Sequence, residues 1–246
     1  MQNYNAPADL LNDRIVLVTG AGKGIGRMAS LAYAQHGATV ILLDKDLGLL
    51  ESVYDEIEAQ GYPEAAIYPM DLQHAGPDAY DTLAETLEKE FGRLDGLLHN
   101  AAQLKLLSRI DDYDFETWYQ VLQVNLNAPF MITQVCLPLL RESEQASLLF
   151  TSDTVGRHGK AYWGAYGVSK FGIEGLMQIL AQELENSAIR VNSIDPGPTA
   201  TDLRHLAYPG EDKSGLKSAE DLAPLYLWLM GRDSHDTHGQ AISYEA

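Results

Sequence analysis

Cysteine is nearly absent from this sequence, and long hydrophobic runs are missing. Cys136 is the only cysteine among 246 residues, so no disulfide can form within the chain. It lies in an apolar run with helical spacing, which indicates a buried structural thiol rather than a nucleophile. No run reaches the length of a transmembrane helix, and segment 1–9 lacks the basic and apolar regions of a signal peptide. These features predict a cytoplasmic protein.

Basic residues are also scarce. The chain has 17 Lys and Arg against 35 Asp and Glu, which gives a formal net charge of −18. Nucleic acids and anionic membranes both attract proteins through clustered Lys and Arg, so neither is an expected partner. No repeat of fixed period and no low-complexity tract is present, and no metal site is predicted. The expected partner is a small-molecule substrate.

Short apolar runs alternate regularly with longer amphipathic segments. This alternation predicts a parallel sheet with helices on both faces, and right-handed crossovers make it doubly wound. We therefore expect one α/β domain over 1–246, a Rossmann fold with a parallel seven-stranded sheet. The expected strands are 14–19, 39–43, 66–70, 94–99, 147–151, 189–194 and 240–244. The expected helices are 24–37, one ending at 59, 78–91, 115–141 with a bend at Pro129, 165–185, and 218–230 with a capping box from Ser218 to Asp221.

A glycine-rich turn joins the first expected strand to the first helix. Gly20, Gly24 and Gly26 allow a tight turn and a close approach of the backbone to a pyrophosphate, and the helix N-terminus adds free N–H groups. The spacing is Gly-x-x-x-Gly-x-Gly, which differs from the general dinucleotide fingerprint. A purely structural tight turn is the alternative interpretation.

Asp44 ends the second expected strand. An acidic residue there accepts hydrogen bonds from the ribose hydroxyls and repels a 2′-phosphate, so it favours NAD(H). The alternative is a cap for the following helix. Lys23 and Lys45 act in the other direction, because either could meet a 2′-phosphate, and NADP(H) stays open. Asp71, at the end of the third strand, is placed to bond the adenine amino group.

From about Leu11 onward the chain resembles a classical short-chain dehydrogenase/reductase. The matching motifs are 19–26, Asn100-Ala-Ala, Asn125, Tyr166-x-x-x-Lys170 and Pro196-Gly-x-x-x-Thr201. Segments 156–166 and 224–231 further resemble the YciK-type bacterial oxidoreductases. The usual Asn-Ala-Gly reads Asn-Ala-Ala here, which adds a methyl group beside the cofactor. The resemblance implies these cofactor-binding residues: Gly20, Lys23, Gly24, Ile25, Gly26, Asp44, Asp71, Leu72, Asn100, Ala101, Tyr166, Lys170, Pro196, Gly197, Thr199 and Thr201.

The resemblance also implies a mechanism. Tyr166 exchanges a proton with the substrate oxygen while hydride moves to or from the nicotinamide, so the chain would interconvert an alcohol and a carbonyl. A free tyrosine has a pKa of about 10, and Lys170, one helical turn on, would lower it. Asn125 corresponds to the family's asparagine that supports a water relay, and Thr201 would contact the nicotinamide carboxamide.

One departure bears on the chemistry. The family's catalytic serine lies thirteen residues before the tyrosine, and here that position holds Asp153. Ser152 and Thr154 flank it, but neighbours in an extended segment point to opposite faces. An ionised carboxylate ~5 Å from the phenol, at an effective dielectric of ~20, opposes phenolate formation by about 3 kcal/mol. That is about 2 pKa units, comparable to the contribution of Lys170. The carboxylate also cannot donate a hydrogen bond to a carbonyl.

Three functions stay open on these grounds. The first is an oxidoreductase on an alcohol or carbonyl, slowed or retuned by Asp153. The second is a cofactor-binding protein with little catalysis, acting by binding or assembly. The third is another reaction on this scaffold, such as dehydration or epimerisation.

The substrate and the oligomeric state are less constrained. The loop near 196–217 is expected to cover the substrate with Leu203, Leu206 and Tyr208, and His158, Tyr162 and Trp163 are candidate lining residues. The family implies a homo-dimer or homo-tetramer through helices 115–141 and 165–185. Four apolar residues of the second helix are expected to supply the contact surface: Phe171, Ile173, Leu176 and Met177.

Overall fold

At least one helix separates each strand from the next in the computed structural model, which describes residues 4–244. All strand pairs are parallel, and their order across the sheet is β3-β2-β1-β4-β5-β6-β7. The single parallel seven-stranded sheet of the sequence prediction is confirmed. The strands are β1 Ile15–Thr19, β2 Thr39–Asp44, β3 Ala66–Pro69, β4 Gly96–His99, β5 Ala146–Thr151, β6 Ile189–Asp195 and β7 Ala241–Ser243.

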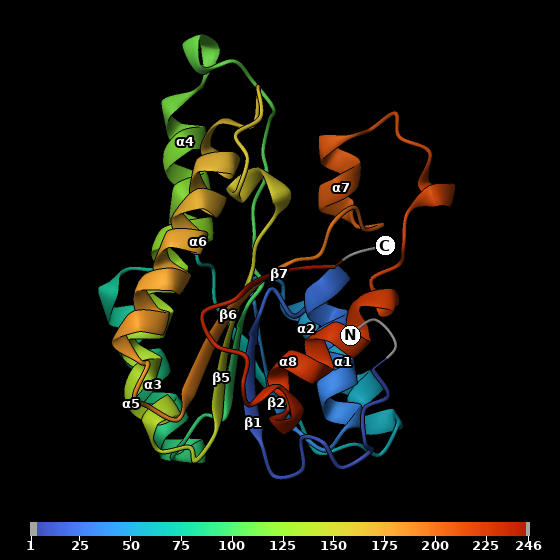
Figure 1. Ribbon diagram of the computed structural model, residues 1–246, viewed down its shortest axis with the longest axis vertical. Helices are drawn as coiled ribbons and strands as arrows, with labels where there is room; N and C mark the ends of the chain where they lie inside the picture. The colour runs from blue at the N-terminus through green and yellow to red at the C-terminus, as the bar shows by residue number, and fades with distance from the viewer. Residues whose placement is uncertain (1–3, 245–246) are drawn as a thin grey trace.

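Helices cover both faces of the sheet, as Figure 1 shows. One face carries α1 Gly24–Gln35, α2 Leu47–Ala59 and α8 Ala223–Met230; the other carries α3 Pro77–Phe91, α5 Ala128–Arg141 and α6 Gly164–Glu183. Cys136 lies fully buried in the second layer, where burial raises the pKa of its thiol to about 12. The structural interpretation of this cysteine therefore fits its surroundings.

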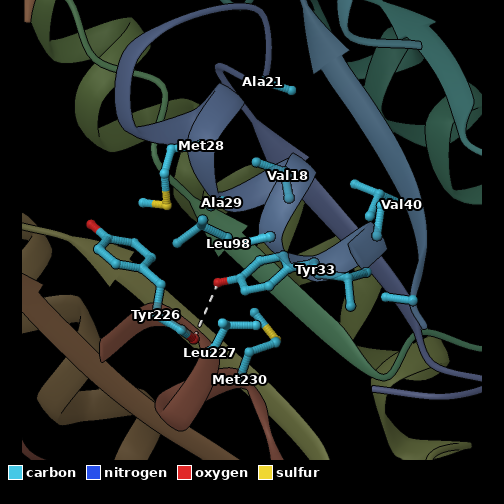
Figure 2. Packing of buried hydrophobic residues seen from close by; sticks show 14 of the residues in the cluster. Val18, Ala21, Met28, Ala29, Tyr33, Val40, Leu98, Tyr226, Leu227 and Met230 are labelled. Carbon is cyan, nitrogen blue, oxygen red and sulfur yellow. Dashed lines mark hydrogen bonds between the residues drawn. The ribbon is translucent and has the colours of Figure 1, made fainter. Parts of the chain in front are cut away.

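Buried apolar side chains of α1 and α8 pack against the central strands of the sheet (Figure 2). Val18 of β1 and Leu98 of β4 are inaccessible to solvent, and so are Tyr33 of α1 and Met230 of α8. The Tyr33 hydroxyl donates to the carbonyl of Tyr226 at 3.5 Å, so even the polar end of this ring has a partner. Burial of complete strand faces accounts for the near-continuous apolar runs of the strands.

The long helical region 115–141 contains an irregularity that the sequence did not reveal. It divides into α4 Phe115–Leu122, a π-helical turn Gln123–Asn127 and α5. Pro129 lies in the first turn of α5 and follows the π turn almost directly, so the regular helix is interrupted next to the proline where a bend was expected. The widened π turn carries Asn125, and such turns are frequent at functional sites.

The segment expected to be a loop near 196–217 contains a helix, α7 Asp202–Ala207. It stands beyond the carboxyl ends of the strands (Figure 1). Farther on, Ser218 and Asp221 form the predicted capping box, with Asp221 N–H donating to Ser218 Oγ and Ser218 N–H donating to Asp221 Oδ2. The helix itself begins later than predicted, because a short 3₁₀ turn, Glu220–Leu222, precedes α8. Over residues 4–244, no helix combines the length and apolar character that a membrane span needs.

Candidate active site

A cavity of about 520 Å³ opens where the strands end at their carboxyl termini. Ligands of open parallel sheets bind at this edge. The cavity brings together all the predicted cofactor and catalytic residues except two, Gly26 and Asn125, which lie behind its wall. Those that line it are Gly20, Lys23, Gly24, Ile25, Asp44, Asp71, Leu72, Asn100, Ala101, Asp153, Tyr166, Lys170, Pro196, Gly197, Thr199 and Thr201.

The glycine-rich turn leaves room for a ligand because side chains are excluded from it. Gly20 has a φ of +67°, and a Cβ there would lie 2.8 Å from the Ala101 Cα. A Cβ on Gly26 would overlap the carbonyl oxygen of Gly20. Helix α1 begins at Gly24, and Lys23 before it provides no side-chain cap. This cradle of backbone N–H groups at a helix N-terminus fits the pyrophosphate of a dinucleotide.

The Asp44 carboxylate lies against this turn. Its Oδ2 accepts from the Gly22 N–H at 3.2 Å, and its Oδ1 accepts from the Asp46 N–H at 3.3 Å. The cap of helix α2 is Asp46, whose side chain accepts from the Leu49 N–H. The alternative interpretation of Asp44 as that cap is therefore wrong, and its carboxylate faces the cavity that the cofactor would occupy.

The other charged residues at the cofactor end of the cavity differ in whether they have an ion-pair or hydrogen-bond partner. Lys23 forms an exposed ion pair with Asp202 of α7 at 3.1 Å. Lys45 is exposed on the cavity wall, and no acidic group among residues 4–244 lies within ion-pair distance of it. Asp71 accepts from His74 Nδ1 at 2.7 Å. Of the two lysines, Lys45 is thus the one whose ammonium is unengaged.

Tyr166 and Lys170 lie one turn apart near the start of α6, and Asp153 faces the tyrosine. The Tyr166 hydroxyl donates to Asp153 Oδ2 at 3.2 Å. The backbone of Asp153 is extended, with φ −163° and ψ 154°, so no bulge turns its neighbours inward. Ser152 Oγ is buried without a hydrogen-bond partner, and Thr154 Oγ1 donates to Asp195. The structure places neither flanking hydroxyl on the phenol.

Burial and charge set the proton affinities of this pair. Burial, followed by the negative charge and the hydrogen bond of Asp153, raises the pKa of Tyr166 well above its ordinary value. Burial lowers the pKa of Lys170 to about 8, although the carboxylates of Asp153, Glu174 and Asp195 oppose that effect. The Lys170 ammonium donates to the Thr151 carbonyl at 2.7 Å and lies 5.5 Å from the centre of the Tyr166 ring.

Asn125 connects the π turn to the back of the catalytic helix. Its Oδ1 accepts from the Gln103 N–H at 2.7 Å, and its Nδ2 donates to the Gln103 carbonyl and to Ser169 Oγ. Ser169 Oγ in turn donates to the Tyr166 carbonyl. Asn125 therefore acts here as a brace between the segment after β4 and the helix that carries Tyr166.

The far end of the cavity is mostly apolar. Trp163 stands beside Tyr166, with 5.4 Å between ring centres, and Leu203 and Ala207 complete this wall. Tyr208 packs in the same cluster. The prediction that His158 and Tyr162 line the site is wrong, because both are exposed and neither borders the cavity. Of the three residues expected to cover the substrate, Leu203 borders the cavity, whereas Leu206 and Tyr208 do not.

Several cavity residues escaped the sequence analysis. Among them are Gln73, Gln103, Val124 and Arg204. Gln103 directly follows the Asn100-Ala-Ala motif, and that adjacency was an available signal. Arg204 had no such signal, because its position depends on the helix α7 that the sequence did not reveal.

Comparisons with known proteins give matches over nearly the whole chain. The profile of the short chain dehydrogenase family matches residues 14–212. The uncharacterized oxidoreductase YciK of Escherichia coli is 46% identical over 237 residues, which cover 96% of this chain and 94% of that protein. A short chain dehydrogenase structure from Pseudomonas syringae is 50% identical, covers 98% of both chains and gives a TM-score of 0.96. One from Shigella flexneri, complexed with NADP, is 46% identical, covers 96% and 99% of the two chains and gives a TM-score of 0.94.

Proposed function

Because the chain belongs to the short-chain dehydrogenase/reductase family of oxidoreductases, we propose that it interconverts an alcohol and a carbonyl compound by hydride transfer, with Asp153 retuning the reaction. The observation that supports this most is the arrangement of Tyr166, Lys170 and the glycine-rich cradle around one cavity. A bound NAD(P) cofactor supplies or accepts the hydride. We propose that this chain's own residues hold the cofactor and control the proton.

The roles follow from position and charge. The N–H groups at the start of α1 hold the pyrophosphate, and Asp44 accepts from the adenosine ribose hydroxyls. Lys170 holds the nicotinamide ribose, and its ammonium favours the phenolate form of Tyr166. Tyr166 gives its proton to, or takes it from, the substrate oxygen. Asp153 accepts the Tyr166 proton in a hydrogen bond and supplies no donor to the substrate.

Turnover with a panel of alcohols, aldehydes and ketones tests this function, with NADH or NADPH absorbance as the readout. Tyr166→Phe is the matched control, because it removes only the hydroxyl. We expect measurable turnover that this variant abolishes for carbonyl substrates. Cofactor binding without turnover of any member would instead favour a binding role.

We propose that NAD(H) binds more tightly than NADP(H), by at least about tenfold or 1.4 kcal/mol. The carboxylate of Asp44 beside the glycine turn would repel a 2′-phosphate. The NADP complex of the Shigella relative gives this preference no support, so calorimetry with both cofactors must decide it. Asp44→Ala is expected to remove the preference. Tighter binding of NADP(H) to the unaltered chain would show that the unengaged Lys45 outweighs Asp44.

We also propose that the chain forms a homo-dimer or homo-tetramer. Large apolar side chains lie exposed on α4, α5 and α6, among them Phe115, Phe130 and Phe171. The expected set needs correction, because Ile173 and Met177 are buried against the sheet. Phe171→Glu is expected to shift the light-scattering mass toward the monomer. Leu47→Glu, on α2 at the opposite face, is the matched control. A monomeric wild-type chain at micromolar concentration would refute the proposal.

A further inference from the structure

We propose that the hydride acceptor preferred by this site is a protonated carbon–nitrogen double bond, an iminium cation, rather than a neutral carbonyl. This inference rests on the proposed function for the hydride source and the place of reaction, and it goes beyond it in the substrate class. It begins from the charges around the Tyr166 hydroxyl.

Two carboxylates near that hydroxyl have only neutral hydrogen-bond donors. Asp153 accepts from the Val155 N–H and from Tyr166. Asp195 accepts from Thr154 Oγ1 and from the Gly197 N–H. Within residues 4–244, neither carboxylate takes part in an ion pair at 4.0 Å or less.

The cations nearby are engaged elsewhere. Arg204 forms a two-pronged pair with Glu211, at 2.7 Å and 2.5 Å, and lies over the ring of Tyr208. Lys170 donates to the Thr151 carbonyl.

Within residues 4–244, the remaining charged groups of this region form no ion pair with the two carboxylates. Arg157 pairs with Glu174, and Lys217 donates to the Pro198 carbonyl. Lys170 and Lys217, which donate to carbonyls, balance the two carboxylates at longer range. Of the two carboxylates, Asp153 is the one that borders the cavity, and among residues 4–244 no cation lies within ion-pair distance of it. A cationic ligand with an N–H group would therefore make a direct contact with Asp153 that no residue of the chain supplies.

The neighbouring wall fits an organic cation rather than a hydrated inorganic ion. Trp163, Leu203 and Ala207 present apolar surface in the same cavity, and Trp163 stands beside Tyr166, which contacts Asp153. An aromatic ring beside one carboxylate is a combination that stabilises substituted ammonium and iminium groups. The carboxylate supplies the hydrogen-bond acceptor, and the apolar wall holds the carbon skeleton.

A carbonyl and an iminium differ in how they interact with the Asp153 carboxylate. A carbonyl oxygen has only lone pairs to present to a carboxylate, so it is repelled. An iminium N–H donates to the carboxylate while its positive charge is compensated. Hydride from NAD(P)H adds to the iminium carbon, the π electrons move to nitrogen, and the products are a neutral amine and NAD(P)⁺. No proton transfer from Tyr166 is needed in that step, so its high proton affinity does not oppose the reaction.

The test compares matched cyclic imines and ketones of two sizes, pyrroline with cyclopentanone and dihydroisoquinoline with β-tetralone. For wild type we expect kcat/KM for the imines to exceed that for the ketones by at least about tenfold. Asp153→Asn keeps the shape of the side chain and removes its charge, and it is expected to lower imine reduction by about 10²-fold, the scale of a broken buried charge pair. For the imines, Tyr166→Phe is expected to lower kcat/KM less than Asp153→Asn does. For the ketones, Tyr166→Phe is expected to lower kcat/KM more than Asp153→Asn does.

A second readout does not need turnover. Calorimetry without cofactor should show that tetrahydroisoquinoline, a cation at neutral pH, binds wild type more tightly than the neutral β-tetralol, and that Asp153→Asn removes this difference. Wild type that reduces ketones in preference to imines, or that reduces neither, overturns the inference, and so does equal binding of the two products. Failure of NADH and NADPH to bind at all would instead overturn the proposed function.

Discussion

Asp153→Ser is expected to raise the rate of ketone reduction by up to about 10²-fold, the scale of one oxyanion donor. The substitution replaces the carboxylate that accepts from the Tyr166 hydroxyl with a neutral hydroxyl at the same extended position. It removes the negative charge that opposes phenolate, and it supplies a donor for the substrate carbonyl. Steady-state kinetics on a panel of ketones measures the effect.

Two controls make this result interpretable. Asp153→Ser combined with Tyr166→Phe should lose the gain, because the phenol still carries the proton. Ser152→Ala tests the neighbouring hydroxyl, which also borders the cavity and has no hydrogen-bond partner among the described residues. The ketone rate should stay unchanged, because neighbours in an extended segment point to opposite faces. Equal or lower rates for Asp153→Ser on every ketone, with Tyr166→Phe inactive, would mean that the donor comes from another residue.

Lys170→Met is expected to abolish carbonyl reduction and at the same time to stabilise the fold. Burial lowers the pKa of Lys170 from 10.5 to about 8, a difference that corresponds to about 3 kcal/mol. Methionine avoids this cost, but it leaves the Thr151 carbonyl without its donor, a loss of about 1–2 kcal/mol. At pH 7 the variant should therefore gain about 1–2 kcal/mol in free energy of unfolding.

The pH dependence of the stability difference between Lys170→Met and the wild type distinguishes the cost of burying the Lys170 charge from a general packing effect. Between pH 8 and 10.5 the unfolded chain holds the Lys170 proton and the folded chain has lost it, so the wild type gains stability as pH rises. The advantage of Lys170→Met should shrink across that window and be largest below pH 8. Denaturant unfolding at fixed protein concentration measures it. Lys105→Met, at an exposed lysine, should show no such trend. A constant difference across the window would contradict the account.

The sequence predicted those features that depend on local pattern. Short apolar runs between amphipathic segments predicted the strands, and the central strands are largely apolar because they are buried on both faces. The thirteen-residue spacing, taken from the resemblance to the family, correctly placed the Asp153 carboxylate opposite the phenol. Strand alternation then turned its two neighbours away from the phenol.

Features that depend on packing between distant segments were not predictable. On the π turn, Asn125 forms hydrogen bonds with Gln103 and Ser169, which lie on distant segments of the chain. Helix α7 is one and a half turns long, and its sequence resembles a loop; Thr201 caps it by accepting from the Arg204 N–H. The burial of Ile173 and Met177 was misjudged because the sequence does not show which face of α6 meets the sheet.

The most direct test is the titration of Tyr166 itself, followed by NMR with carbon-13 at the tyrosine Cζ and assigned with Tyr166→Phe. This titration needs no substrate, and it measures directly how Asp153 affects the pKa of Tyr166. We expect the Tyr166 resonance of the wild type to stay that of the neutral phenol beyond pH ~10, the ordinary tyrosine pKa. In Asp153→Ser its pKa should fall. Ionisation of Tyr166 below pH ~10 in the wild type, or an unchanged pKa in the serine variant, would contradict the claim that Asp153 controls this phenol.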